Sequence, residues 1–299
     1  MSDAIRVGLV GFGYASKTFH APLIGGTPGV ALKAVASSDA DKVHADWPGV
    51  KVMSAPGDLL DDPDIDLVVI ATPNDTHFPL AKAALEAGKH VVVDKPFTVT
   101  LSQARELESL AKHCGRILSV FHNRRWDSDF LTVSALINEG QLGEVCYFES
   151  HFDRFRPQVR QRWREQAGPG SGIWYDLAPH LLDQVVVLFG LPVSITVDLA
   201  QLRPGAQSTD YFHAVLAYPQ RRVVLHGTLL AAAESARFIV HGSRASYIKY
   251  GLDPQEERLK NGERLPQEDW GYDMRDGTLT RAEGDERSQE KWLTLPGNY

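Results

Sequence analysis

The chain has 299 residues, of which 43% are hydrophobic and 23% charged, and its formal net charge is −7. This composition is ordinary for a globular protein of about two domains, and without a basic stripe it argues against nucleic-acid binding. Cys114 and Cys146 lie far apart with no CxxC pair, so neither a disulfide framework nor a metal site is indicated. Because no apolar run spans a membrane and a strand pattern begins too early for a signal peptide, we expect a cytoplasmic protein.

Residues 1–121 alternate short apolar runs with helical patterns. The predicted strands are 5–10, 31–36, 66–71, 90–94 and 117–121, and the clearest helices are 77–87 and 100–113. The strand runs are continuously apolar, which is typical of a parallel sheet covered on both faces. Thr100 is a predicted N-cap, and Gly88 and Gly115 stand where helices should stop. We therefore predict an N-terminal Rossmann domain with a doubly wound parallel sheet.

The pattern changes in residues 122–299, which we predict to form a second α/β domain. The expected helices are 127–139 and 180–190, and the expected strands are 193–199, 211–218, 222–230, 237–242 and 246–251. Strands joined by short turns favour an open, largely antiparallel sheet with helices on one face. Its other face is a candidate subunit interface, so a homodimer or homotetramer is expected. Residues 252–299 are polar and rich in Gly and Pro, and are interpreted as extended loops.

The turn after the first strand reads Gly11-Phe12-Gly13-Tyr14-Ala15-Ser16. Glycines at the first and third positions allow a tight turn and a close approach of a pyrophosphate to backbone amides at a helix start. Serine replaces the third glycine of the dinucleotide fingerprint. The alternative is a simple glycine-rich turn, but its place at the first strand of a βαβ series favours dinucleotide binding.

The end of the second strand bears on which dinucleotide is bound. An acidic residue there would hold the ribose hydroxyls of NAD, but the chain has Ser37 and Ser38 at this point. Two hydroxyls would accommodate the 2′-phosphate of NADP, and Lys42 could reach toward it. The sequence thus favours NADP over NAD. In the alternative, Asp39 performs the role of the acid.

Two further strands end in residues that we expect at the cofactor, because ligands lie beyond the carboxyl ends of such strands. One strand is followed by Thr72, Pro73, Asn74 and His77. These would flank the nicotinamide half of the cofactor. In the alternative they only start the next helix, with Asp75 or Thr76 as its cap.

The other strand, 90–94, stops at Asp94-Lys95-Pro96. Proline restricts the backbone of the residue before it, so Lys95 would be held at the same rim. A fixed lysine can hydrogen-bond a hydroxyl that loses a hydride. A cis peptide bond before Pro96 is a further hypothesis. The alternative is a surface lysine at a strand end.

The segment 171–190 contains the third candidate group. At 100° per residue, His180 lies away from the centre of the apolar face, with Asp176 and Gln184 one turn before and after it. Because Pro179 is best tolerated in a first helical turn, Asp176 could be only an N-cap and His180 an ordinary solvent-facing residue. In the functional interpretation, His180 accepts a proton and Asp176 positions the substrate or the imidazole.

Taken in order, the Gly11/Gly13 turn, "ATPNDTH", "GKHVVVDKPF" and "DLAPHLLDQ" resemble the Gfo/Idh/MocA oxidoreductase family over essentially the whole chain. "NRRWDSDF" resembles its bacterial branch with NADP-dependent scyllo-inositol dehydrogenases. The resemblance implies that Lys95, Asp176 and His180 form the catalytic group and that the open sheet forms the dimer interface. The family's usual Glu-Lys-Pro is Asp-Lys-Pro here. Relatives run some tens of residues longer, so the chain is expected to be truncated or incompletely represented at its C-terminus.

The resulting prediction is an NADP-preferring or NAD-dependent dehydrogenase that acts on a secondary hydroxyl or ketone of a cyclic polyol or sugar. Candidate substrate contacts are Arg124, Trp126, Arg156 and Trp163. Two alternatives remain. One is a non-catalytic, dinucleotide-sensing regulatory protein on the same fold. The other is an enzyme with tightly bound cofactor that couples two sugar substrates.

Overall fold

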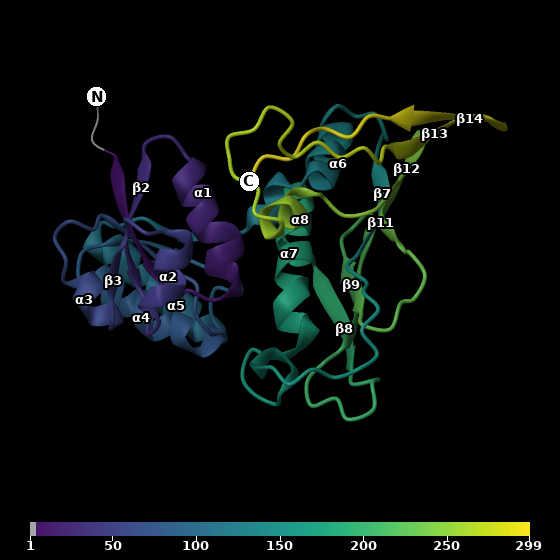
Figure 1. Cartoon of the computed structure of the whole chain (residues 1–299). Coiled ribbons are helices and arrows are strands. Elements are labelled where there is room, and N and C mark those ends of the chain that lie inside the picture. Colours follow the sequence, from purple (N-terminus) through teal and green to yellow (C-terminus); the bar gives the residue numbers. More distant parts are fainter. Residues whose placement is uncertain (1–3) are drawn as a thin grey trace. The chain divides into compact units, whose positions relative to one another are not determined.

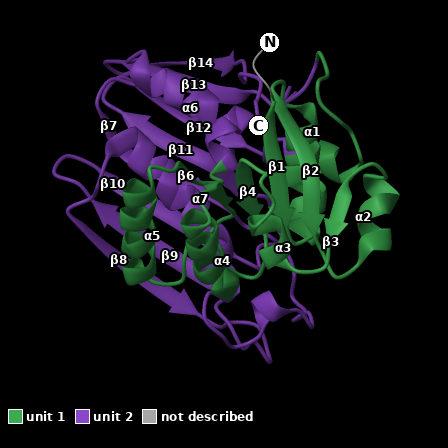
Figure 2. Cartoon of the chain, turned by 90° about the vertical axis from the view of Figure 1, so that its left-hand side faces the viewer, with its two compact units in different colours: residues 1–122, 256–268 green, residues 123–255, 269–299 purple. Residues whose placement is uncertain are grey.

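A computed structural model describes residues 4–299, whose course is traced in Figure 1. The chain divides into two compact units, coloured separately in Figure 2. The first unit holds the residues up to 122 together with 256–268, and the second holds 123–255 and 269–299. The segment 256–268 therefore belongs to the first unit, although it follows most of the second unit in the sequence.

The first unit is built on a six-stranded sheet in the order β3-β2-β1-β4-β5-β6. All neighbouring strands are parallel. The strands are β1 (Ile5–Val10), β2 (Val30–Ala36), β3 (Lys51–Met53), β4 (Leu67–Ile70), β5 (His90–Val93) and β6 (Leu118–Val120). This order confirms the predicted doubly wound sheet, with the reversal of strand order between β1 and β4. The sequence prediction missed β3, which has only three residues.

Helices cover both faces of this sheet. They are the π-helical turn η1 (Ser16–His20), α1 (Ala21–Gly26), α2 (Ala40–Asp46), α3 (Pro56–Leu60), α4 (Asn74–Glu86) and α5 (Leu101–Cys114). In β4, Val68 and Ile70 belong to the same core as Leu85 of α4. Val69, between them, belongs to a second core with Ala21 of α1. Because alternate residues enter different cores, the strand is apolar throughout.

The ends of α4 and α5 follow from local hydrogen bonding. Thr100 caps α5 in a reciprocal capping box, and Gly115 ends that helix with φ 62°. Gly88 follows α4 with φ 73°. These predictions are confirmed. The proposed cap at Asp75 or Thr76 is wrong: α4 starts at Asn74, and the Thr76 hydroxyl donates to the Pro73 carbonyl at 2.6 Å.

The second unit contains an eight-stranded sheet in the order β14-β13-β12-β11-β7-β10-β9-β8. Its strands are β7 (Val145–His151), β8 (Ser194–Ala200), β9 (Tyr211–Ala217), β10 (Arg222–Thr228), β11 (Ala236–Gly242), β12 (Ala245–Tyr250), β13 (Gly277–Glu283) and β14 (Glu286–Trp292). Only the β7–β10 pair is parallel among these neighbours, which confirms a largely antiparallel sheet. The prediction of loops over 252–299 is wrong, since β13, β14 and α8 (Gln255–Lys260) lie there. β14 is polar and exposed along most of its length, so it carries no hydrophobic alternation.

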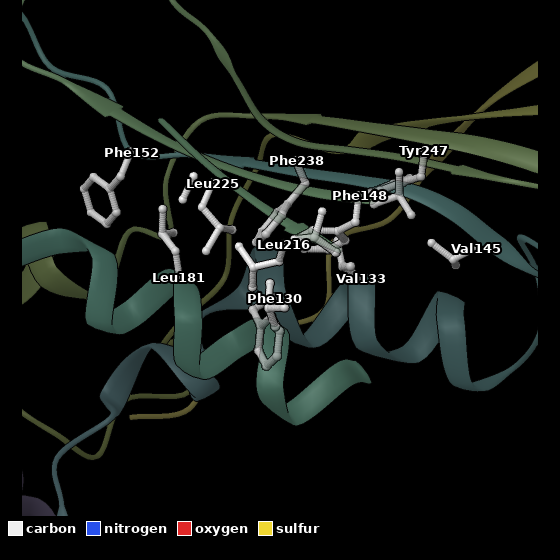
Figure 3. Close-up of a cluster of buried hydrophobic side chains, with 14 of the residues drawn as sticks. Phe130, Val133, Val145, Phe148, Phe152, Leu181, Leu216, Leu225, Phe238 and Tyr247 are labelled. Atoms are coloured by element: carbon white, nitrogen blue, oxygen red, sulfur yellow. The ribbon is translucent and has the colours of Figure 1, made fainter. Parts of the chain in front are cut away.

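One face of this sheet packs against helices. These helices are α6 (Ser128–Asn138) and α7 (Gly172–Phe189), and the short turns η2 (Asn123–Trp126) and η3 (Trp163–Glu165) contact α7. Figure 3 shows Phe148 and Leu225 of the sheet facing Phe130 of α6 and Leu181 of α7, and all four belong to one buried cluster. α7 is thus fixed by its apolar face, which sets the direction of its remaining side chains.

α7 begins at Gly172, eight residues before the predicted start at 180. Asp176 therefore lies inside the helix and is not its N-cap, which is Ser171. Pro179 also lies in the interior. A proline there removes one backbone hydrogen bond, but the burial of Leu177 and Leu181 on either side holds the helix together.

Candidate active site

The turn after β1 has the geometry that a dinucleotide pyrophosphate requires. Gly11 has φ 88°, a left-handed conformation that favours glycine. A Cβ built on Gly13 would meet no atom within 4 Å, so the space beside this backbone is open. Ser16, which replaces the third glycine, is fully buried and its hydroxyl donates to the Gly11 carbonyl at 2.8 Å. The serine that departs from the fingerprint therefore stabilises the turn.

A cavity of about 560 Å³ adjoins this turn in the first unit. It lies at the carboxyl ends of β1, β2 and β4, where strand order reverses and such sheets bind ligands. Its lining includes the predicted cofactor residues Gly11, Phe12, Ser37, Ser38, Thr72 and Pro73. It also includes Ser54, Pro56, Thr76, Pro79 and Leu80, which the sequence prediction missed. Ser54 and Pro56 follow β3, so an assigned third strand would have indicated them.

The remaining predicted cofactor residues do not line this cavity. Tyr14 is more than half exposed, and its hydroxyl donates to Glu256 at 3.0 Å. Asn74 is buried as the first residue of α4. Ala15 precedes η1 in a helical backbone conformation.

At the end of β2, the lining of the cavity contains no carboxylate. Asp39 is the N-cap of α2, and its carboxylate accepts from the Lys42 backbone N–H at 3.0 Å. The Asp39 backbone N–H in turn donates to the Ser37 hydroxyl at 3.2 Å. Asp39, the acid of the alternative, is thus held at the start of α2 and is not among the residues that line the cavity.

His77 supports the turn that carries Lys95. Its ring is buried on α4, with Nδ1 2.8 Å from the Pro96 carbonyl and Nε2 3.0 Å from the Thr72 carbonyl. One imidazole therefore ties the residues after β4 to those after β5. The Lys95–Pro96 peptide bond is cis, as hypothesised from the sequence.

Asp94 sits beneath the same turn. Its Oδ1 accepts from the Lys95 backbone N–H at 2.8 Å, and its Oδ2 lies 3.9 Å from Nε2 of the buried His20. Burial alone would raise the pKa of Asp94, but the His20 imidazole and the Lys95 charge outweigh it and hold that pKa below its usual range. An ionised Asp94 thus fixes the backbone from which the Lys95 ammonium extends.

In the second unit, α7 presents Asp176 and His180 one turn apart. His180 is only 5% exposed, so the alternative of an ordinary solvent-facing histidine is wrong. Asp176 Oδ1 lies 3.8 Å from Arg164 Nε. Gln184, a further turn along, is buried, donates to the Arg124 carbonyl at 2.8 Å and accepts from Arg237 at 3.1 Å. These contacts hold the polar stripe of α7 in one orientation.

The Arg124 guanidinium belongs to a buried ionic network. It lies 3.2 Å from the Asp127 carboxylate, which also accepts from the Tyr299 hydroxyl at 2.7 Å. Arg237 pairs with Asp129 at 3.2 Å. Burial raises the pKa of Asp127 to about 8; the Arg124 charge opposes this rise, and the charges of Asp129 and Asp253 add to it. This places Arg124, a predicted substrate contact, in the interior of the second unit.

The other predicted substrate contacts are more accessible. Trp126 is about half exposed, and Trp163 lies in η3 with the Arg164 guanidinium 4.7 Å from its ring centre. Arg156 is half-buried. Only these three of the four candidates reach the surface of the unit.

The same unit has one group of side chains of the kind that ligates metals, which the sequence prediction did not foresee. His151 Nδ1 is 3.1 Å from Asp153 Oδ2, and His226 Nε2 is 3.6 Å from Asp153 Oδ1. His151 Nε2 also lies 2.6 Å from Glu149. Each ring nitrogen of His151 lies against a carboxylate, so hydrogen bonding is sufficient to explain why these side chains lie close together.

Comparison with known proteins agrees with this geometry. Residues 5–122 match the family model described as "Oxidoreductase family, NAD-binding Rossmann fold", and residues 134–295 match "Oxidoreductase family, C-terminal alpha/beta domain". The chain belongs to the Gfo/Idh/MocA oxidoreductase family. It is 81% identical to the uncharacterized oxidoreductase YdgJ of Escherichia coli over all of this chain and 86% of YdgJ.

Two further Gfo/Idh/MocA-like relatives are informative. One is scyllo-inositol 2-dehydrogenase (NADP(+)) IolW of Bacillus subtilis, 37% identical over 99% of this chain and 84% of IolW. The other is the solved structure of YPO2259, described as an oxidoreductase, from Yersinia pestis. It has a TM-score of 0.96 and 69% identity over 100% of this chain and 84% of that one. The protein is therefore an NAD(P)-binding oxidoreductase of this family. Within residues 4–299, no helix combines the length and hydrophobicity needed to cross a bilayer.

Proposed function

We propose that the protein is an NADP-preferring dehydrogenase that oxidises a secondary hydroxyl of a cyclic polyol or sugar, inositol-like in shape, or reduces the corresponding ketone. The observation that carries this proposal is the presence of Lys95, Asp176 and His180 in one chain with an open dinucleotide turn. The 37% identity to an NADP-dependent scyllo-inositol dehydrogenase supports it. The first unit would serve the cofactor and the second the substrate.

Lys95, Asp176 and His180 would each have a different role toward one substrate. The nicotinamide cofactor, when bound, supplies the hydride chemistry. The Lys95 ammonium donates a hydrogen bond to the reacting oxygen and stabilises the negative charge that grows there. An imidazole nitrogen of His180 accepts the hydroxyl proton, and the Asp176 carboxylate orients the substrate.

The preference for NADP rests on the end of β2. Ser37 and Ser38 line the cavity there, and the nearest carboxylate, Asp39, is engaged as a helix cap. A 2′-phosphate would thus meet hydroxyl groups in a cavity lining that contains no carboxylate. Replacing Ser37 with aspartate should lower kcat/KM for NADP at least tenfold by charge repulsion. A wild-type enzyme that strongly prefers NAD would contradict the preference.

We also propose that the protein assembles as a homodimer or homotetramer through the sheet face that the helices do not cover. Alternate residues of β9, such as Tyr211, His213 and Val215, are half-buried on that face while their neighbours lie in the core. Light scattering after gel filtration would test this, and a monomer at micromolar concentration would contradict it.

A polyol and sugar panel, followed by NADPH absorbance with each cofactor, tests the activity itself. We expect turnover of at least one cyclic polyol or sugar, and a loss of about 10²–10⁴-fold in kcat for His180→Ala. A matched control is His113→Ala, on α5 of the first unit. Normal turnover by both Lys95→Met and His180→Ala on a good substrate would refute the assignment.

A further inference from the structure

The segment between β7 and α7 is strongly basic in a chain that is acidic as a whole. Residues 154–166 contain five arginines and a single carboxylate, Glu165, whereas the net charge of the chain is −7. The five are Arg154, Arg156, Arg160, Arg162 and Arg164. Guanidinium groups of such a cluster that are withdrawn from water are stabilised by internal partners or by an external anion.

Two carboxylates of the second unit, Glu165 and Asp210, hold part of this segment. The Glu165 carboxylate accepts from Arg162 Nε at 2.8 Å, from the Arg160 backbone N–H at 2.9 Å and from Arg203 Nη2 at 3.1 Å. Arg203 is itself buried and also pairs with Asp210 at 2.9 Å. Glu165 and Asp210 therefore hold the loop together through Arg162 and Arg203.

Arg156 is the arginine of this loop whose surroundings are least favourable for a positive charge. It is half-buried, and among residues 4–299 no hydrogen bond or ion pair to its guanidinium is found. Burial and then the charges of Arg154, Arg160 and Arg162 lower its pKa, and only Asp176 acts in the opposite direction. A half-buried cation among like charges is unfavourable, and a bound anion would remove that cost.

The basic loop also reaches the residue that we propose to position the substrate. Arg162, Arg164 and Asp176 line one cavity of about 10 Å³, which has room for about one water molecule. Arg164 lies 3.8 Å from the Asp176 carboxylate. A ligand that touches Asp176 from the solvent side would therefore meet the positive field of this loop.

We propose that the substrate carries an anionic group, a carboxylate or a phosphate, on its sugar or polyol ring, and that Arg156 binds this group. This inference rests on the proposed function, because it places the substrate at Asp176. A guanidinium recognises either anion through two parallel hydrogen bonds, which suits Arg156 better than a neutral hydroxyl would.

Calorimetric titration of the full chain with NADP present tests the proposal without turnover. The probes are hexoses and cyclic polyols, each beside its matching uronate and sugar phosphate. The expected result is at least tenfold tighter binding of one anionic class, with the tighter class distinguishing carboxylate from phosphate. Arg156→Gln should reduce this preference about tenfold, and Arg156→Lys should retain part of it.

Arg105→Gln, an exposed arginine of α5 in the first unit, is the matched control and should leave the preference unchanged. Equal binding of neutral and anionic probes, or an unchanged preference in Arg156→Gln, would overturn the inference. Steady-state kinetics on the same probes separate the two proposals. Turnover of neutral probes without an anion preference contradicts this inference alone. Tight anion binding without any turnover contradicts the proposed function alone.

Discussion

Replacing Gly13 with alanine should separate cofactor binding from folding. A Cβ at this position would meet no protein atom within 4 Å, and Gly13 does not have a left-handed backbone. The folded state should therefore tolerate the methyl group, and the loss of glycine flexibility in the unfolded chain stabilises by about 0.4–1 kcal/mol. The same methyl group would occupy the space that a pyrophosphate needs. We expect NADPH affinity to fall at least tenfold, or about 1.4 kcal/mol.

Gly11→Ala is the variant with which Gly13→Ala should be compared. Gly11 has φ 88°, and its added Cβ would lie 3.0 Å from the Ala71 carbonyl oxygen. The left-handed conformation alone costs about 1–2 kcal/mol for a residue with a Cβ. This variant should lose both stability and affinity.

Urea unfolding measures the stability of both variants, and quenching of protein fluorescence by NADPH measures their affinity. Gly13→Val should extend the series, with a further loss of affinity and little change in stability. If Gly13→Ala bound NADPH as tightly as the wild type, the turn would not be the pyrophosphate site. If it unfolded as readily as Gly11→Ala, the space beside Gly13 would not be open.

Three further changes test the elements around the site. His77→Ala should lower the free energy of unfolding by about 2–4 kcal/mol in urea, because it removes a buried ring whose two nitrogens lie at hydrogen-bond distance from the Pro96 and Thr72 carbonyls; a loss below about 0.5 kcal/mol would contradict that role. Asp127 keeps its proton in the folded state up to about pH 8. In the unfolded chain, the Asp127 carboxyl group loses this proton near its ordinary pKa of 3.8. The free energy of unfolding should therefore fall, as the pH rises from about 5 to 8, by up to ~1.4 kcal/mol per pH unit. Asp127→Asn should flatten that slope in urea titrations, and equal slopes would refute the assignment. Thr100→Ala should cost about 1 kcal/mol through loss of the capping box, whereas Thr98→Ala in the preceding loop should cost less.

The first unit was the more predictable part of the fold, for reasons visible in its residues. Runs such as 67–70 enter two cores at once, so every position is apolar and the strand stands out. The ends of α5 are set by Thr100 and Gly115, whose chemistry is local. β3 was missed because three residues carry no detectable period. β14 was missed because backbone pairing with β13, and not burial of its side chains, makes it a strand.

The candidate site shows a similar division. The glycine turn, the serines after β2 and the cis Lys95–Pro96 bond could be predicted, because each depends on residues adjacent in sequence. The contacts that hold these residues in place could not be predicted from the sequence. The His77 ring lies 2.8 Å from the Pro96 carbonyl, nineteen residues away, and the Ser16 hydroxyl donates back across the turn to the Gly11 carbonyl. The helical period placed His180 away from the apolar face, but only tertiary structure shows that this stripe of α7 is also buried.

We propose that Lys95 acts on the reacting oxygen and not on the binding of the cofactor. Lys95→Met is the most direct test, with Lys112→Met on the exposed face of α5 as its control. Both kcat on the best substrate of the panel and the NADPH dissociation constant should be measured for each variant. We expect Lys95→Met to lose at least a hundredfold in kcat while its NADPH dissociation constant stays within about threefold of the wild type. An undiminished kcat, or a loss explained wholly by weaker NADPH binding, would contradict it.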